Sequence, residues 1–155
     1  MQAIPHLHFK GNCGEAFGFY AKTLGGRIAF SMTFGESPAA AQMPREAHDQ
    51  IIHARLELGP QAMPITGCDV PGDRYQKPQG FSVLAEIAEP AEAERVFGAL
   101  AERGTITMPF QETFWAKGFG MCTDRFGIPW MVNCVKPMEQ TSRAPEAARN
   151  SSARG

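Results

Sequence analysis

The sequence has little net charge and no long apolar run. It contains 15 Lys and Arg residues against 16 Asp and Glu residues, a formal net charge of −1, and no block of basic residues. Because nucleic acids and anionic membrane surfaces are bound through many cationic side chains, this composition argues against both as partners. No stretch approaches the roughly 18 apolar residues of a membrane-spanning helix, and the first residues lack a signal-peptide pattern. We therefore expect a cytoplasmic protein.

Cysteine is also scarce and irregularly spaced. The four cysteines form no C-x-x-C pair: Cys13, Cys68, Cys122 and Cys134. A chain of 155 residues with 43% hydrophobic residues can bury a substantial core without covalent cross-links. We therefore expect free thiols, in either one compact domain or two small fused modules.

The sequence does contain a repeated order of predicted elements. The first half has an alternating strand at 3–9 and a helix from Asn12 to Gly25-Gly26. Three further strands follow it, at about 27–35, 51–59 and 61–68. The second half has a strand, a helix and three strands in the same order, at 81–88, from Pro90 to Gly104, and at about 105–116, 119–124 and 129–136. Each half is thus predicted to be a β-α-β-β-β unit.

The two halves align when one is moved along the other by 78 positions (97 − 19). This shift places Phe19 on Phe97, Gly26 on Gly104 and Ile28 on Ile106. Each unit would bury its helix against one sheet face and leave the other face free to curve around a ligand, which predicts an α+β fold. The predicted divisions are a first module, a linker, a second module and a flexible tail: 1–69, 70–80, 81–137 and 138–155.

Local signals predict how these elements begin, end and pack. Asn12 is placed to cap the first helix, with Glu15 reaching back to complete a capping box. Gly104 is predicted to end the second helix. Asp124 is predicted to shape the turn that follows it through bonds to nearby backbone N–H groups, and Trp130 to pack beneath the second helix.

Several motifs together resemble a known superfamily. The segments GNCGEAFGFYAKTLGG, IIHARLELG and TFWAKGFGMCTDRFGIPWMVN, within the paired β-α-β-β-β plan, are similar to the vicinal oxygen chelate superfamily. That superfamily includes glyoxalase I, the bleomycin-resistance proteins and the extradiol dioxygenases. The chain most resembles its PhnB-type branch, also labelled 3-demethylubiquinone 3-methyltransferase-like, over about residues 3–136. The resemblance implies a curved mixed β-sheet with helices on its outer face, and a homodimer.

The resemblance also bears on metal binding. Enzymes of the superfamily hold a divalent ion on the concave face through His, Glu or Gln side chains of the first and last strand of each module. The corresponding positions here are Pro5, a position near Ile65, a position near Phe81, and Met131. None of these side chains is a ligand for a hard metal ion. We therefore expect no metal and no cofactor.

The histidines divide into two groups. His6 and His8 share one face of the first strand, but their parity is opposite to that of Pro5, so we expect them to face the helix in a structural role, or to be solvent-exposed. His53 shares the polar face of 51–59 with Arg55 and Glu57, which are expected to be cross-strand partners. Because an imidazole can transfer protons near neutral pH, His53 is the candidate catalytic residue.

The predicted ligand cavity takes residues from both modules. Gln111 and Trp115 share one parity of the predicted strand 105–116, and together they look like a ligand wall or, alternatively, a subunit contact. Met131 and Asn133 share a face of the last strand. The full predicted set of ligand-binding residues is Phe9, His53, Phe81, Gln111, Trp115, Met131 and Asn133.

Three functions are compatible with these residues. The first is a small-molecule-binding protein that works without metal, like the bleomycin-resistance branch. The second is an enzyme of lyase, isomerase or dioxygenase type that uses displaced metal ligands or His53 as a general base. The third is a dimeric interaction module without catalysis. Methyl transfer has little support, because no Gly-rich loop resembles a nucleotide-binding fingerprint.

Overall fold

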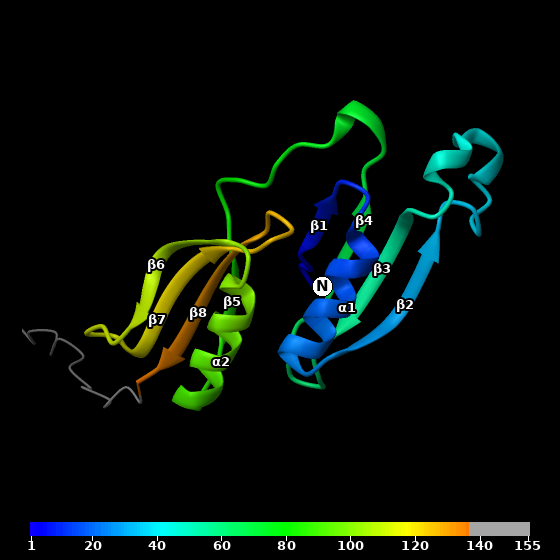
Figure 1. Ribbon diagram of the computed structural model, residues 1–155. Coiled ribbons are helices and arrows are strands. Elements are labelled where there is room, and N and C mark those ends of the chain that lie inside the picture. The colour runs from blue at the N-terminus through cyan, green and yellow to red at the C-terminus, as the bar shows by residue number, and fades with distance from the viewer. Residues whose placement is uncertain (137–155) are drawn as a thin grey trace, which may run out of the picture.

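The computed structural model describes residues 1–136 and shows two modules side by side (Figure 1). The predicted tail 138–155 lies outside the described residues. The first module consists of β1 (His6–Phe9), α1 (Cys13–Leu24), β2 (Arg27–Thr33), β3 (Ile51–Glu57) and β4 (Ile65–Asp69). The second consists of β5 (Val83–Glu86), α2 (Pro90–Ala101), β6 (Thr105–Gln111), β7 (Ala116–Thr123) and β8 (Pro129–Val135). Each module thus has the predicted β-α-β-β-β order.

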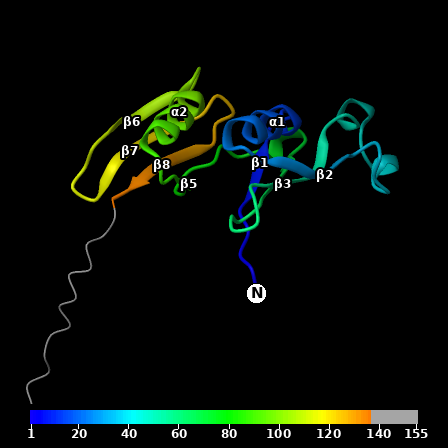
Figure 2. The same ribbon diagram turned by 90° about the horizontal axis from the view of Figure 1, so that it is seen from below.

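The eight strands form two four-stranded mixed sheets. Their strand orders are β1-β4-β3-β2 and β5-β8-β7-β6, with β1 parallel to β4, β5 parallel to β8, and the other pairs antiparallel. Figure 2 shows that α1 and α2 lie on the same side of these sheets. The predicted α+β fold of two modules with external helices is confirmed, and each sheet keeps one face that its helix does not cover.

Neither helix is long enough to cross a membrane. Each has 12 residues, and no helix within 1–136 combines the length and apolar content that a membrane span needs.

The start of α1 differs from the prediction. Asn12 stands at the N-cap position, but it makes no side-chain capping bond, so the predicted capping box with Glu15 is wrong. The carboxylate of Asp69 at the end of β4 accepts the backbone N–H of Cys13 at 2.9 Å and that of Ile51 at 2.8 Å. A buried acid distant in sequence therefore supplies the cap and ties α1 and β3 to β4.

Glycines end the two helices for different reasons. Gly25 has φ of 71°, the left-handed conformation expected at the end of α1. At the end of α2 the left-handed residue is Arg103, with φ of 59°, rather than Gly104. A Cβ on Gly104 would clash with the backbone oxygen of Thr123, and one on Gly26 would clash with that of Glu57. The repeated glycine of the two modules is thus required by close backbone packing.

A buried carboxylate joins the modules. Asp124, 3% exposed, accepts backbone N–H groups of Phe126 and Ile128 at 2.8 and 3.0 Å, which confirms its predicted role in the turn. Its other oxygen accepts the hydroxyl of Tyr20 at 2.5 Å and the indole N–H of Trp130 at 2.8 Å. Because Tyr20 belongs to α1 and Asp124 to the second module, this network holds the two halves together.

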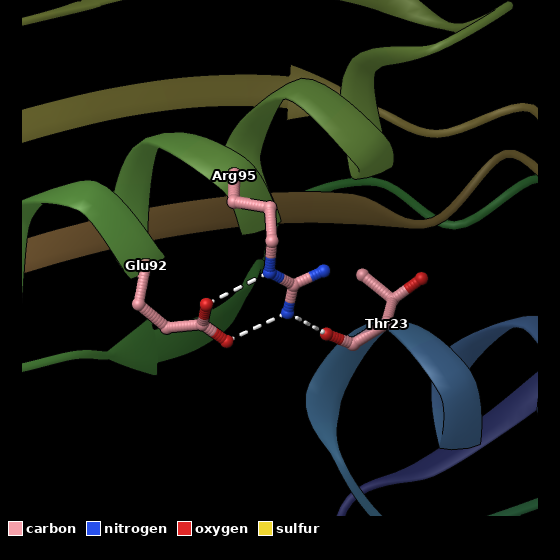
Figure 3. A network of polar contacts seen from close by, with 3 residues as sticks. All are labelled: Thr23, Glu92 and Arg95. Carbon is pink, nitrogen blue, oxygen red and sulfur yellow. Dashed lines mark hydrogen bonds and ion pairs between the residues drawn. The ribbon is translucent and has the colours of Figure 1, made fainter.

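A second contact between the modules lies at the helices (Figure 3). Arg95 of α2 donates to the carbonyl oxygen of Thr23 at 2.8 Å, in the last turn of α1. Glu92 fixes the guanidinium from its own helix through two hydrogen bonds of 2.8 and 2.6 Å. A cation at the C-terminal end of a helix satisfies a free carbonyl and complements the helix dipole.

Replacing Asp124 should destabilise the whole chain. In Asp124→Asn, an amide N–H replaces the carboxylate oxygen that accepts from Tyr20 and Trp130. The hydroxyl and the indole N–H would then point at another hydrogen-bond donor. We expect a loss of about 2–4 kcal/mol in the free energy of unfolding, measured by urea denaturation. The control Tyr20→Phe removes one donor and should cost about 1–2 kcal/mol. A loss below roughly 0.5 kcal/mol in Asp124→Asn would contradict this account.

Tyr20 should make the fold sensitive to alkali. Burial, followed by the nearby Asp124 carboxylate, raises the pKa of the Tyr20 hydroxyl. The unfolded chain loses this proton near pH 10 while the folded chain keeps it, so ionisation favours the unfolded state above about pH 10, by up to about 1.4 kcal/mol per pH unit. Urea midpoints measured between about pH 8 and pH 11 should fall less steeply in Tyr20→Phe than in the wild type. Equal slopes would show that the hydroxyl ionises freely in the folded state.

Candidate functional site

On the uncovered face of the first sheet, the neighbouring strands β1 and β4 carry two imidazoles and a thiol. On β1, Phe9 is 0% exposed beneath α1, whereas His6 and His8 point away from the helix. The parallel register of β1 and β4 pairs His6 with Thr66 and His8 with Cys68. Four side chains with polar or sulfur atoms therefore lie next to one another on this face.

This placement corrects two predictions. His6 and His8 do not face the helix, and Phe9 does not line a ligand cavity, because it packs in the core with Phe17, ring centroids 6.1 Å apart. The alignment that placed a metal position at Pro5 is out of register with the strand. A shift of one residue along a strand moves every side chain to the opposite face.

Ile65 shows the same effect on β4. The resemblance places the superfamily's metal position at the end of the first module near Ile65, but Ile65 itself is 3% exposed and belongs to the core. The neighbouring Thr66 and Cys68 face the histidines instead. Neither residue is among the predicted site residues, because only the register of β4 against β1 shows that they lie beside the histidines.

The hydrogen bonds of His6 define its protonation. Its Nδ1 lies 2.9 Å from Oγ1 of Thr66, and that hydroxyl donates to the carbonyl oxygen of Pro5 at 3.1 Å. We assign the imidazole proton to Nδ1, because a hydroxyl that donates its single proton to Pro5 can only accept from His6. The lone pair is then on Nε2, which lies 3.4 Å from Sγ of Cys68.

Aromatic contacts fix the orientation of the His6 ring. His53 of β3 stacks on it at 5.8 Å between ring centroids, with 10° between the planes. His8 meets it edge to face at 5.4 Å. Burial first, and then the charges of His8 and His53, lower the pKa of His6. A neutral imidazole is therefore favoured at this position.

A hollow of about 550 Å³ opens beside the histidines. It is lined by His6, His8, the linker residues 76–79 and Phe81, which is 49% exposed. Burial, and then the Asp69 carboxylate, raise the pKa of the nearby Cys68 thiol, so this cysteine is protonated at neutral pH and is not an activated nucleophile.

The charged residues of β3 fit their structural prediction in part. Glu57 forms an ion pair with Arg27 across the β2–β3 pair, and its carboxylate lies 3.9 Å from Nε of Arg55. The carboxylate of Glu57 is thus engaged by arginines at one end of the strand. His53 instead contacts the rings of His6 and Phe30, the latter at 5.9 Å.

The uncovered face of the second sheet is largely apolar and carries one amide. Met131 and Asn133 of β8 are half-buried on this face, while Trp130 and Val132 are buried on the helix side, as predicted for Trp130. The cross-strand neighbours of the two residues are Leu84, Glu86, Phe119 and Met121. The amide therefore lies between Phe119 of β7 and the charged Glu86 of β5, with the two methionines next to it along the strands.

The side-chain oxygen of Asn133 has no hydrogen-bond partner among the described residues, although it is covered. An unpaired buried acceptor costs free energy, and native proteins contain few of them. The amide can accept a hydrogen bond from a molecule on this face once the side chains that cover its oxygen move aside.

Gln111 and Trp115 border the same face, but not through a common strand. Gln111 ends β6 and pairs with Phe119 of β7. The predicted strand 105–116 is wrong beyond this point, because Thr113 exchanges hydrogen bonds with the backbone of Ala116 and closes a hairpin. Trp115, 44% exposed, lies in this hairpin with its ring 5.5 Å from that of Phe119.

The predicted ligand-binding residues therefore divide among the two sheet faces and the core. Four lie together on or beside the second sheet: Gln111, Trp115, Met131 and Asn133. His53 lies on the first sheet, Phe81 borders the hollow beside His6, and Phe9 is in the core. Figure 2 shows that both helices cover the same side, so the two free faces point to the opposite side.

Known proteins match this chain over most of its length. A family model described as 3-demethylubiquinone-9 3-methyltransferase matches residues 1–133. Protein YjdN of Escherichia coli (strain K12) is 36% identical over 144 residues, covering 88% of this chain and 97% of that protein.

Solved structures agree with the family match. Protein PA1353 of Pseudomonas aeruginosa is 45% identical with a TM-score of 0.79, covering 87% of this chain and 98% of that one. A PhnB protein of Bacillus cereus, described as a putative 3-demethylubiquinone-9 3-methyltransferase, has the same fold. It is 23% identical with a TM-score of 0.73, and the match covers 87% of this chain and 100% of that one. The chain therefore belongs to the family of this 3-demethylubiquinone-9 3-methyltransferase model.

Proposed function

We propose that this protein binds a small, flat, largely apolar molecule carrying a hydrogen-bond donor, on the uncovered face of the second sheet and without a metal ion at that face. The observation that carries the proposal is the covered side-chain oxygen of Asn133, which has no hydrogen-bond partner within residues 1–136 and lies on a face that also carries Met131 and Phe119. Small-molecule sites commonly combine such an apolar surface with a few polar groups that fix orientation.

The side chains around Asn133 suit an aromatic ligand. Met121 and Met131 face each other across β7 and β8, and flexible thioethers adapt to the faces of aromatic rings. Phe119 and Trp115 meet edge to face and add a rigid apolar border. Gln111 supplies a second polar group at the rim.

A second copy of the chain would enclose this site. Both free faces point to the same side of one chain, so neither covers the other (Figure 2). A two-fold dimer that lays the first sheet of one copy over the second sheet of its partner would bring His53 opposite Asn133 and form two equivalent sites. This arrangement agrees with the homodimer that the superfamily resemblance implies.

The ligand class can be tested with a matched pair of probes. We expect 2-naphthol, which has a hydroxyl donor, to bind about tenfold more tightly than 2-methoxynaphthalene, because only the former satisfies Asn133. The affinities are measured by quenching of Trp115 fluorescence and by thermal shift. In Asn133→Leu, both probes should still bind, but the difference between their affinities should disappear. Equal affinities in the wild type would contradict the role of Asn133, and no binding of either probe would contradict the aromatic class.

The shared site can be tested by mixing variants. His53→Ala and Asn133→Leu alter opposite walls, so each alone should bind 2-naphthol weakly. After joint refolding from urea, half of the dimers contain both variants and one intact site each, which restores about a quarter of the wild-type sites. Trp115→Ala and Asn133→Leu both alter the wall formed by the second sheet, so a mixture of these two variants should restore no intact sites. Equal recovery in the two mixtures, or none in either, would rule out a site built from both copies.

A further inference from the structure

We propose that His6, His8 and Cys68 of the first sheet bind one divalent cation with affinity for sulfur and imidazole, such as Zn²⁺, whose fourth coordination position opens into the adjacent hollow. The candidate ligand atoms of these three residues all lie within 4.8 Å of one another. They come from neighbouring strands, β1 and β4, in direct register.

The distance between His6 and Cys68 suits a tetrahedral ion. Nε2 of His6 lies 3.4 Å from Sγ of Cys68. In a tetrahedral zinc site, with bonds of about 2.0–2.1 Å to nitrogen and about 2.3 Å to sulfur, these atoms are about 3.5 Å apart. Two of the three ligands are therefore already placed to share an ion, and the exposed His8 side chain needs only a small rotation to complete the set.

The environment of His6 prepares its ring for coordination. Its Nδ1 proton is donated to Thr66, whose hydroxyl is held in turn by the carbonyl oxygen of Pro5. Histidines that bind metal characteristically donate their other ring N–H to such a partner, which fixes the tautomer and the ring orientation. The stacked ring of His53 adds a second restraint. The Nε2 lone pair therefore points toward Cys68, and the ion would take the place of the thiol proton in that contact.

The hollow gives the ion an open position. His6 and His8 line a space of about 550 Å³ together with Phe81 and linker residues 76–79. Zinc sites with three protein ligands and an accessible fourth position hold water or a bound molecule there. A small ligand with an oxygen or sulfur donor would thus reach the ion from the linker side.

This site differs from the four-position site of the superfamily's enzymes. Those enzymes take one ligand from the first and last strand of each module, whereas here all three ligands belong to one module and one of them is a thiol. Phe81 and Met131 contribute no ligand. The proposal replaces the expectation of no metal for the first sheet, and its three ligands are distinct from the residues proposed to bind the aromatic ligand.

Cobalt titration of the full-length protein tests the proposal. Protein stripped with a chelator under a phosphine reductant should bind one Co²⁺ per chain, with a thiolate-to-cobalt charge-transfer band and the intense visible bands of tetrahedral geometry. Zn²⁺ should displace it. We expect Cys68→Ser to lose the charge-transfer band, His8→Ala to weaken binding by at least tenfold, and Thr66→Val to weaken it by about 10–100-fold.

Matched controls separate this site from other thiols and imidazoles. Cys134→Ala and His48→Gln change a cysteine and a histidine that are outside the cluster, and both should bind Co²⁺ like the wild type. Circular dichroism and urea midpoints verify that each variant is folded. Absence of stoichiometric Co²⁺ binding at millimolar metal, or a charge-transfer band that persists in Cys68→Ser, would overturn the proposal. The 2-naphthol assay on metal-free protein reports the second-sheet site separately.

Discussion

The carboxylate of Asp124 is the contact on which the joined modules depend. Its oxygens accept two backbone N–H groups of their own turn, the indole of Trp130 and the hydroxyl of Tyr20 from the other module. A buried charge is stable only when such donors surround it, so the turn, the core tryptophan and α1 must all be in place together. The ion-paired Arg95 reinforces the junction at the helix ends. Both free sheet faces are consequently held on the same side of the chain.

Which side chains occupy those faces follows from strand register. On β1, a register shift of one residue decides which side chains meet the helix. Leu7 and Phe9 are buried there, rather than His6 and His8, because they have the larger apolar area. The same alternation sets Thr66 and Cys68 beside the histidines and places Met131 with Asn133 on the other sheet. One face therefore gathers imidazoles and a thiol, and the other gathers thioethers, aromatic rings and an amide. The two faces suit different ligands.

Sequence reasoning was most successful where the signal is local. Period-two alternation and the glycine and proline positions identified the strands, both helices and the turn at Asp124. It failed where the answer depends on a partner distant in sequence. The cap of α1 comes from Asp69, 56 residues after Cys13, and the hairpin at Trp115 interrupts an alternation that reads as one long strand. The predicted cavity combined residues from both sheets. The alternation along a strand shows which face a residue occupies, but it does not show whether the faces of two sheets lie opposite each other.

The sequence by itself determined the two β-α-β-β-β modules, the free thiols and the resemblance to the vicinal oxygen chelate superfamily, because hydrophobic period, turn residues and motifs are properties of neighbouring residues. The tertiary structure alone decided that His6, His8 and Cys68 converge, that Phe9 is core, and that the oxygen of Asn133 lacks a hydrogen-bond partner within residues 1–136. These facts depend on the register between β1 and β4 and on the packing of β7 and β8. Such pairings join segments about 60 and about 10 residues apart, and burial of the apolar strand faces selects them.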